Sequence, residues 1–281
     1  MPTLTLPTAT INYRVAGPEN SQFPPVVFVH GALVDHRLWD PVADILSAKG
    51  FRCVLPDWPL GSHRIPVDSE LSPTSVAAMV HDLLTTLGLD DVTLVGNDTG
   101  GAICQLVVDA YPDLIGRLVL TNCDAFDKFP PFPFNVVFAM LRGQVSIKVL
   151  TELMRVRVLR QSPLGFGLLS RPHPELTASW LEPCRTDAGV RANLATLLRH
   201  IAATDLTVVA DRLPQFTKPV RLVWGMRDRC FTPALGRRLT GQFPDATMVE
   251  VPDASTFVAL DAPHAVADAV EALSRSATGA Q

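Results

Sequence analysis

The sequence GNDTGG at residues 96–101 marks a sharp turn between a strand and a helix. It follows the apolar run DVTLV (91–95) and precedes a segment, up to residue 112, whose apolar residues recur three and four positions apart. Glycines on both sides of Asp98 allow the backbone to double back tightly. We therefore expect Asp98 at the tip of the turn, raised above the end of a strand.

The same alternation of strand and helix continues on both sides of this turn. The apolar runs lack polar alternation, as in strands covered on both faces, so the pattern predicts the α/β class with a mostly parallel sheet flanked by helices. The expected strands are PPVVFVH (24–30), FRCVLP (51–56), DVTLVG (91–96), GRLVLTN (116–122), PVRLVWG (219–225) and ATMVEVP (246–252). The expected helices between and after them cover 72–88, 100–112, 232–244 and 261–275.

The alternation stops between about residue 125 and residue 210, where prolines at 130, 131 and 133 stand among phenylalanines. We expect helices and no strand there, around 144–160, 174–182 and 187–203. An insertion at the carboxyl edge of a parallel sheet lies where ligands bind, so a lid over a pocket is the natural interpretation and a structural appendage is the alternative. The predicted division is a core of residues 1–124 and 208–281 and a helical lid of residues 125–207.

Composition excludes several classes of partner. The 281 residues carry a net charge of −4, which argues against nucleic acid as a partner. No apolar run is long enough to cross a membrane, and the start of the chain does not resemble a signal peptide, so we expect a cytoplasmic protein without a membrane partner. The five cysteines form no CxxC pair, and we expect no metal and no cofactor. A homodimer remains open.

Further motifs fall in a recognisable order along nearly the whole chain. FVHGA (28–32) looks like an HG-x oxyanion loop, PDWPLGS (56–62) is similar to a loop that usually reads PDxxGxGxS, and WGMRD (224–228) looks like a WGxxD acid loop. Together with the turn at residues 96–101, they resemble the α/β-hydrolase superfamily. This resemblance implies the α/β-hydrolase fold with an inserted lid.

An aspartate at the tip of the turn is similar to the branch that contains haloalkane dehalogenases, fluoroacetate dehalogenases and epoxide hydrolases. In that branch the carboxylate attacks an sp³ carbon and forms an ester, which a histidine oriented by a second carboxylate then hydrolyses. The resemblance implies that Asp98 is the nucleophile and Asp228 the second carboxylate. It also implies that the amides of Ala32 and Thr99 are oxyanion donors. The alternative for Asp98 is a turn carboxylate that caps the next helix.

The position of the histidine is occupied by another residue. The family phrase PDAGHFxxLDxP corresponds to VPDASTFVALDAP (251–263), which places Thr256 where the base is expected. Threonine cannot act as a base near neutral pH, and loss of a general base typically costs ~10²- to 10⁴-fold in rate. None of the other histidines is a compelling replacement; they are His30, His36, His63, His81, His173, His200 and His264.

Groups that the related branches use to hold the leaving group are absent. The residue after the nucleophile is Thr99, where haloalkane dehalogenases carry tryptophan and fluoroacetate dehalogenases carry arginine, and neither tyrosine of the chain lies in the lid. We assign His30, Asn97 and Trp180 as candidates for substrate contact. The alternatives are structural hydrogen bonding for His30 and packing for Trp180.

These observations favour an enzyme that acts on a small or medium apolar substrate in a lidded pocket, with Asp98 as nucleophile or as acid/base. One alternative is a non-hydrolytic lyase, isomerase or cyclase that uses the same pocket. Another is a ligand-binding pseudoenzyme that has lost the histidine. Deliberate replacement of that histidine is a further possibility that the sequence leaves open.

Overall fold

A computed structural model describes residues 1–127, 129–141 and 143–278. Its centre is one eight-stranded sheet with the strand order β1-β2-β4-β3-β5-β6-β7-β8. The six predicted apolar runs form β3 to β8, whereas β1 and β2 were not predicted. The strands are β1 (Thr3–Thr5), β2 (Thr10–Ala16), β3 (Val26–Val29), β4 (Cys53–Pro56), β5 (Val92–Asp98), β6 (Ile115–Cys123), β7 (Val220–Gly225) and β8 (Ala246–Val251).

The sheet is parallel from β4 to β8, and the antiparallel pairs, β1 with β2 and β2 with β4, lie at one edge. Strands β3 and β6 are buried along their whole length, because helices cover both faces of the sheet. This arrangement confirms the predicted mostly parallel sheet flanked by helices. Its carboxyl edge holds the ends of β5, β6 and β7, and therefore brings together residues that are far apart in the sequence.

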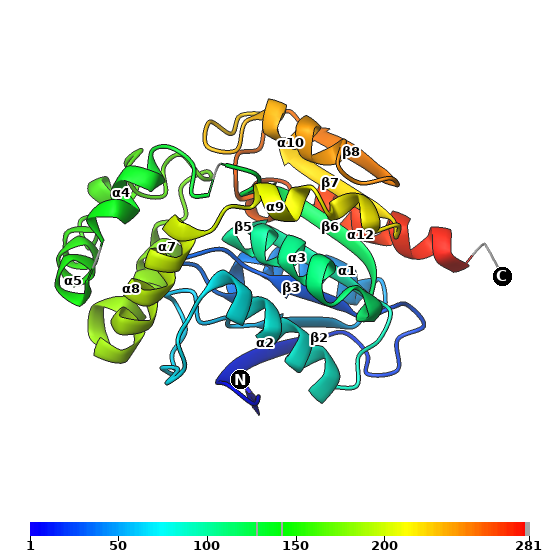
Figure 1. The fold of residues 1–281 in the computed structure, drawn as a ribbon, viewed down its shortest axis with the longest axis horizontal. Coiled ribbons are helices and arrows are strands. Elements are labelled where there is room, and N and C mark those ends of the chain that lie inside the picture. Colours follow the sequence, from blue (N-terminus) through cyan, green and yellow to red (C-terminus); the bar gives the residue numbers. More distant parts are fainter. Residues whose placement is uncertain (128, 142, 279–281) are drawn as a thin grey trace.

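Helices on both sides of the sheet complete the core (Figure 1). Helices α2 and α3 pack side by side, and α1 packs against α12. Helix α12 starts with a proline at its first position. This is favourable because a backbone N–H there would have no hydrogen-bond partner within the helix, so its absence costs nothing. The core helices are α1 (Asp40–Ala48), α2 (Pro73–Thr86), α3 (Thr99–Ala110), α10 (Pro233–Thr240), α11 (Val258–Asp261) and α12 (Pro263–Thr278).

Among the described residues between β6 and β7 there are six α-helices, followed by a 3-10 turn at Leu213–Gln215, and there is no strand. In Figure 1, α4 and α5 lie on the side of the insertion away from the sheet. The helices are α4 (Phe134–Met140), α5 (Gln144–Leu153), α6 (Arg157–Arg160), α7 (Pro174–Thr186), α8 (Ala188–Ala203) and α9 (Thr207–Ala210).

Buried hydrogen bonds fasten α7 to the core. The indole N–H of Trp180 donates to the Asp35 carboxylate at 2.9 Å, and the Ser62 hydroxyl donates to the Trp180 carbonyl at 2.8 Å. The Cys184 thiol lies 3.0 Å from the Gly61 carbonyl oxygen. Trp180 has no exposed surface, so the hydrogen bonds that attach the insertion to the core at this residue are buried between the two.

Candidate active site

The turn at residues 96–101 brings Asp98 to the end of β5, directly before α3 begins at Thr99. Asp98 adopts φ 54° and ψ −132°, a conformation that is sparsely populated for residues other than glycine and that costs about 1–3 kcal/mol. Gly96 and Gly100 on either side of Asp98 do not have a positive φ, and they are needed because other atoms pack closely against them. A Cβ at Gly96 would lie 2.6 Å from the Cys104 sulfur, and a Cβ at Gly100 would lie 2.3 Å from the Val29 carbonyl oxygen.

Burial raises the pKa of Asp98 to about 7, and the negative charge of Asp228 adds to this increase. Hydrogen bonds from the backbone N–H groups of Thr99 and Ala32 act in the opposite direction, because they stabilise the charged carboxylate. The two amides that we expected to converge beside Asp98 therefore point at its own carboxylate. Asp98 is held near the middle of its titration at neutral pH, as is typical of groups that exchange protons in catalysis.

Asp228 lies behind this turn, in the loop after β7, and its carboxylate accepts four hydrogen bonds. One oxygen accepts from the amides of Cys230 and Phe231 at 2.7 and 3.0 Å. The other accepts from the Asn122 amide group and from the Thr256 hydroxyl, both at 2.8 Å. Burial raises the pKa of Asp228 to about 6, although each of these hydrogen bonds acts to lower it.

Thr256 is the hydroxyl donor of this set. Its side chain is fully buried, and its carbonyl oxygen accepts a hydrogen bond from Asn97 at 2.8 Å. Threonine offers a hydroxyl donor and no basic nitrogen. Among the described residues, the hydrogen bonds that hold the Asp228 carboxylate come from amides and from this hydroxyl.

A third carboxyl group, Asp124, lies two residues beyond the predicted strand GRLVLTN, just after the end of β6. It is 1% exposed, and neither carboxylate oxygen has a hydrogen-bond partner of normal geometry among the described residues. Burial and the charge of Asp98 raise the pKa of Asp124 well above its usual value, and the Thr99 hydroxyl lies close enough to oppose this increase. Asp124 is not among the site residues that we predicted from the sequence, although its place after a buried strand is a signal that could have identified it.

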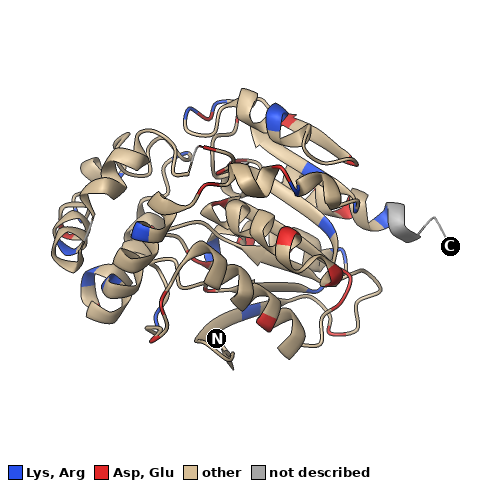
Figure 2. Ribbon diagram, viewed as in Figure 1, with Lys and Arg blue, Asp and Glu red and all other residues tan. Residues whose placement is uncertain are grey.

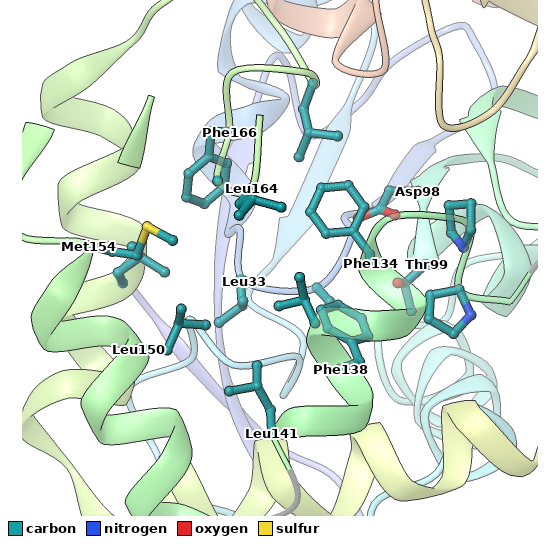
Figure 3. Close-up of a pocket in the computed structure, with 17 residues that line it drawn as sticks. Leu33, Asp98, Thr99, Phe134, Phe138, Leu141, Leu150, Met154, Leu164 and Phe166 are labelled. Atoms are coloured by element: carbon teal, nitrogen blue, oxygen red, sulfur yellow. The ribbon is translucent and has the colours of Figure 1, made fainter. Parts of the chain in front are cut away.

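An apolar cavity lies between Asp98 and the insertion (Figure 3). Its described lining residues are apolar or glycine except for Asp98 and Thr99, whose oxygens lie at one end. Much of the lining comes from the insertion, including Phe134 and Phe138 of α4. The cavity has about 70 Å³ of space for water-sized molecules, which is well above the minimum of roughly 10–15 Å³ that a single water needs.

The three residues that we assigned to substrate contact are not in the lining of this cavity. His30 is fully buried; its Nε2 accepts from the Trp58 amide at 2.9 Å, and its Nδ1 lies 2.9 Å from the Gly31 carbonyl oxygen. The Asn97 side chain joins the ends of β5 and β6, and the N–H of Trp180 is engaged by a core carboxylate. All three side chains form hydrogen bonds that hold neighbouring parts of the protein together. Their placement does not support direct contact with substrate.

The remaining histidines are also absent from the lining of the cavity. His36 pairs with Asp57 at 2.7 Å, which with the nearby acids raises the pKa of this imidazole despite its burial. With Asp35, these two residues place three potential metal-ligand atoms within 4.8 Å of one another. Arg37 and Trp180 already bind the Asp35 carboxylate, so the cluster is explained as a charge network that supports the insertion.

Comparisons with known proteins agree with this architecture. The family model for the alpha/beta hydrolase fold matches residues 24–263. Haloalkane dehalogenase 2 of Mycobacterium bovis is 29% identical over 253 residues, which cover 88% of this chain and 86% of the relative. A 2-hydroxy-6-oxononadienedioate/2-hydroxy-6-oxononatrienedioate hydrolase of a Pseudomonas species is 24% identical over 236 residues, or 79% of this chain and 78% of that protein.

Solved structures resemble the chain over its whole length. The crystal structure of a haloalkane dehalogenase from Bradyrhizobium elkani superimposes with a TM-score of 0.80 at 19% identity and covers 99% of this chain and 98% of its own. A thermophilic esterase from Thermogutta terrifontis gives a TM-score of 0.75 at 19% identity, with 98% and 99% covered. The strand-turn-helix at Asp98, the eight-stranded sheet and the family match lead to one conclusion: the chain belongs to the alpha/beta hydrolase fold family.

Proposed function

We propose that this protein is an enzyme that binds a small apolar substrate beneath the helical insertion and uses Asp98 as its reacting carboxyl group. The cavity supports this proposal, because Asp98 is the one ionisable group among its described lining residues. In this proposal the insertion, residues 125–207, is a lid on a core formed by residues 1–124 and 208–281. Closure of an apolar lid over the carboxyl group excludes water and strengthens its interactions with substrate.

One observation supports one type of reaction at this site over another. The Thr256 hydroxyl binds Asp228 at 2.8 Å in the position of the hydrolytic base, and no histidine lines the cavity. A carboxyl group with a pKa of about 7 can still take a proton from a substrate carbon and return it at another position. We therefore favour proton transfer, in an isomerase, lyase or cyclase type of reaction, over ester hydrolysis.

Hydrogen exchange into a small apolar ketone in D₂O tests this proposal directly. The charged form of Asp98 is the base, so the rate of exchange at the carbon beside the carbonyl should rise with pH, with a midpoint of about 7. Asp98→Asn should abolish the exchange and leave ligand binding intact. Exchange that is unchanged in Asp98→Asn would overturn the assignment. Ligand binding without exchange by any small apolar carbonyl compound would instead identify a binding protein.

A second candidate is covalent reaction with an alkyl halide, which the 29% identity to haloalkane dehalogenase 2 favours. In this reaction Asp98 forms a carbon–oxygen bond to the sp³ carbon, the carbon–halogen bond breaks, and halide leaves with the electron pair. The resulting ester has no imidazole to activate water for its hydrolysis. The expected product is a lasting ester on Asp98, which mass spectrometry can detect.

A further inference from the structure

Large apolar side chains are concentrated on the surface of one part of the insertion, residues 132–164. Of the fourteen large apolar side chains that are exposed among the described residues, ten belong to this segment. Val145 and Val158 are each 78% exposed, and Phe132 and Met140 are each 72% exposed. Single exposed apolar residues are ordinary, but a concentration of this kind marks an interaction surface.

Helical spacing places these side chains on outward faces. In α5, Val145, Val149 and Leu153 are four residues apart and exposed, while Ile147 is buried on the opposite side. Helix α4 is apolar on both sides, because Val136 and Met140 are exposed while Phe134, Val137 and Phe138 line the cavity. Each helix therefore has an apolar face that nothing in the described chain covers.

Charge distinguishes this region from the rest of the protein. Residues 128–173 contain seven Lys or Arg, of which Arg160 is buried, and one Asp or Glu, a formal charge of +6, whereas the whole chain carries −4. The rest of the chain therefore carries −10. Figure 2 shows acidic positions gathered on the core. The exposed apolar face belongs to the basic region of an otherwise acidic molecule.

A second copy of the chain does not match this combination. Pairing of two copies through residues 132–164 would cover apolar surface but bring together two segments that each carry a formal charge of +4. Pairing of an insertion with a core would match charge, but the large apolar side chains exposed outside residues 132–164 are isolated in the described sequence: Met1, Val15, Val208 and Val249. A lipid bilayer that contains anionic headgroups offers apolar and negative groups at one surface.

We propose that residues 132–164 dock this protein onto a membrane surface rich in anionic lipid. Helices α4 and α5 contribute the apolar side chains, and Lys148 and Arg157, both exposed, lie where they can reach the headgroups. This contact is peripheral: among the described residues, no helix could cross a membrane. It differs from our expectation of no membrane partner, which considered only spanning segments.

The docking face is continuous with the cavity. Leu164 is 60% exposed and also lines the cavity, so the cavity reaches the surface within this face. An apolar substrate dissolved in the bilayer could enter without crossing water. The proposal goes beyond the reaction at Asp98 and does not depend on which reaction occurs there.

Sedimentation of the full chain with lipid vesicles tests the proposal. We expect binding to phosphatidylcholine vesicles that contain about 30% phosphatidylglycerol, weaker binding to pure phosphatidylcholine, and a decrease as salt is added. Lys148→Gln should weaken binding about fivefold, because one basic residue near an anionic surface contributes about 1 kcal/mol. Val149→Asp removes apolar contact and adds a negative charge, so its effect should exceed about tenfold.

Val208→Asp is the matched control, because Val208 is 55% exposed against 54% for Val149 but lies in α9, outside the docking face. It should leave vesicle binding unchanged, as should Asp98→Asn, which separates failure of docking from failure of the proposed reaction. Equal binding to neutral and anionic vesicles, or no binding to either, would overturn the proposal. A dimer in analytical ultracentrifugation that Val149→Asp dissociates would also overturn it, since a second copy would then cover the face.

Discussion

Replacement of Asp98 by asparagine should stabilise the folded protein at alkaline pH. Asparagine has nearly the same shape, tolerates a positive φ better than most residues, and still presents an oxygen to the amides of Ala32 and Thr99. It differs from aspartate in having no charge to bury. The effect on stability therefore isolates the cost of the buried charge.

The magnitude follows from the raised pKa of Asp98. Because the pKa is about 7 in the folded protein and 3.8 as a model value, the folded state binds more protons than the unfolded state between these pH values. The free energy of unfolding of the unsubstituted protein thus falls as pH rises from about 4 to about 7. The total decrease attributable to Asp98 is at most about 4 kcal/mol.

Urea unfolding at two pH values measures this difference. At about pH 8.5, Asp98→Asn should raise the free energy of unfolding by up to about 4 kcal/mol, and at about pH 4 most of the gain should disappear. Asp253→Asn is the control, because Asp253 is exposed and pairs with Arg227 at the surface. If Asp98→Asn changes the free energy of unfolding by the same amount at both pH values, the pKa of Asp98 is not raised in the folded protein, which would contradict the prediction.

Three further substitutions test other parts of the site. Thr256→Val removes a donor to the buried Asp228, so it should raise the pKa of Asp228 further and cost about 1–3 kcal/mol in urea unfolding at neutral pH, whereas Thr256→Ser should be tolerated. Asp124→Asn should raise the free energy of unfolding at alkaline pH, since it removes a buried carboxylate that has no hydrogen-bond partner of normal geometry among the described residues. A lower free energy of unfolding at that pH would show that the charge of Asp124 stabilises the fold. Trp180→Phe should lose the hydrogen bond to Asp35 and make the insertion more susceptible to limited proteolysis, and unchanged cleavage would show that the remaining contacts of α7 hold it without this hydrogen bond.

Much of the core could be predicted from the sequence because five of its strands, β3 to β7, are buried along all or nearly all of their length. Apolar runs identified these strands, including the one that ends at Asp98, and also the edge strand β8, although none of its residues is buried. Strand β2 escaped prediction because it lies near the edge of the sheet, where its residues are mostly half-buried and its sequence TINYRVA mixes polar and apolar residues. A search for apolar runs cannot find such a strand.

The sequence positions of the candidate site residues could be predicted, whereas most of the hydrogen bonds between them and distant parts of the chain could not. Local motifs located Asp98, Asp228 and Thr256, and the structure brings Thr256 and Asp228 into a hydrogen bond. The partner of Trp180 is a carboxylate 145 residues away in the chain, and no local pattern specifies such a pairing. The exposed face of α5 has the same helical spacing as a core-facing helix, so only the folded arrangement distinguishes the two.

In our proposal the site lacks a hydrolytic base, because Thr256 occupies the position where the base is expected. Incubation with a reactive alkyl halide, followed by mass spectrometry of the peptide that contains Asp98, shows whether an ester formed there persists. We expect one lasting alkyl group per chain, no label on Asp98→Asn, and release with repeated turnover in Thr256→His, where Asp228 is already in place to orient the new imidazole. Rapid multiple turnover by the unsubstituted protein, with halide released in excess over enzyme and no retained label, would contradict the claim.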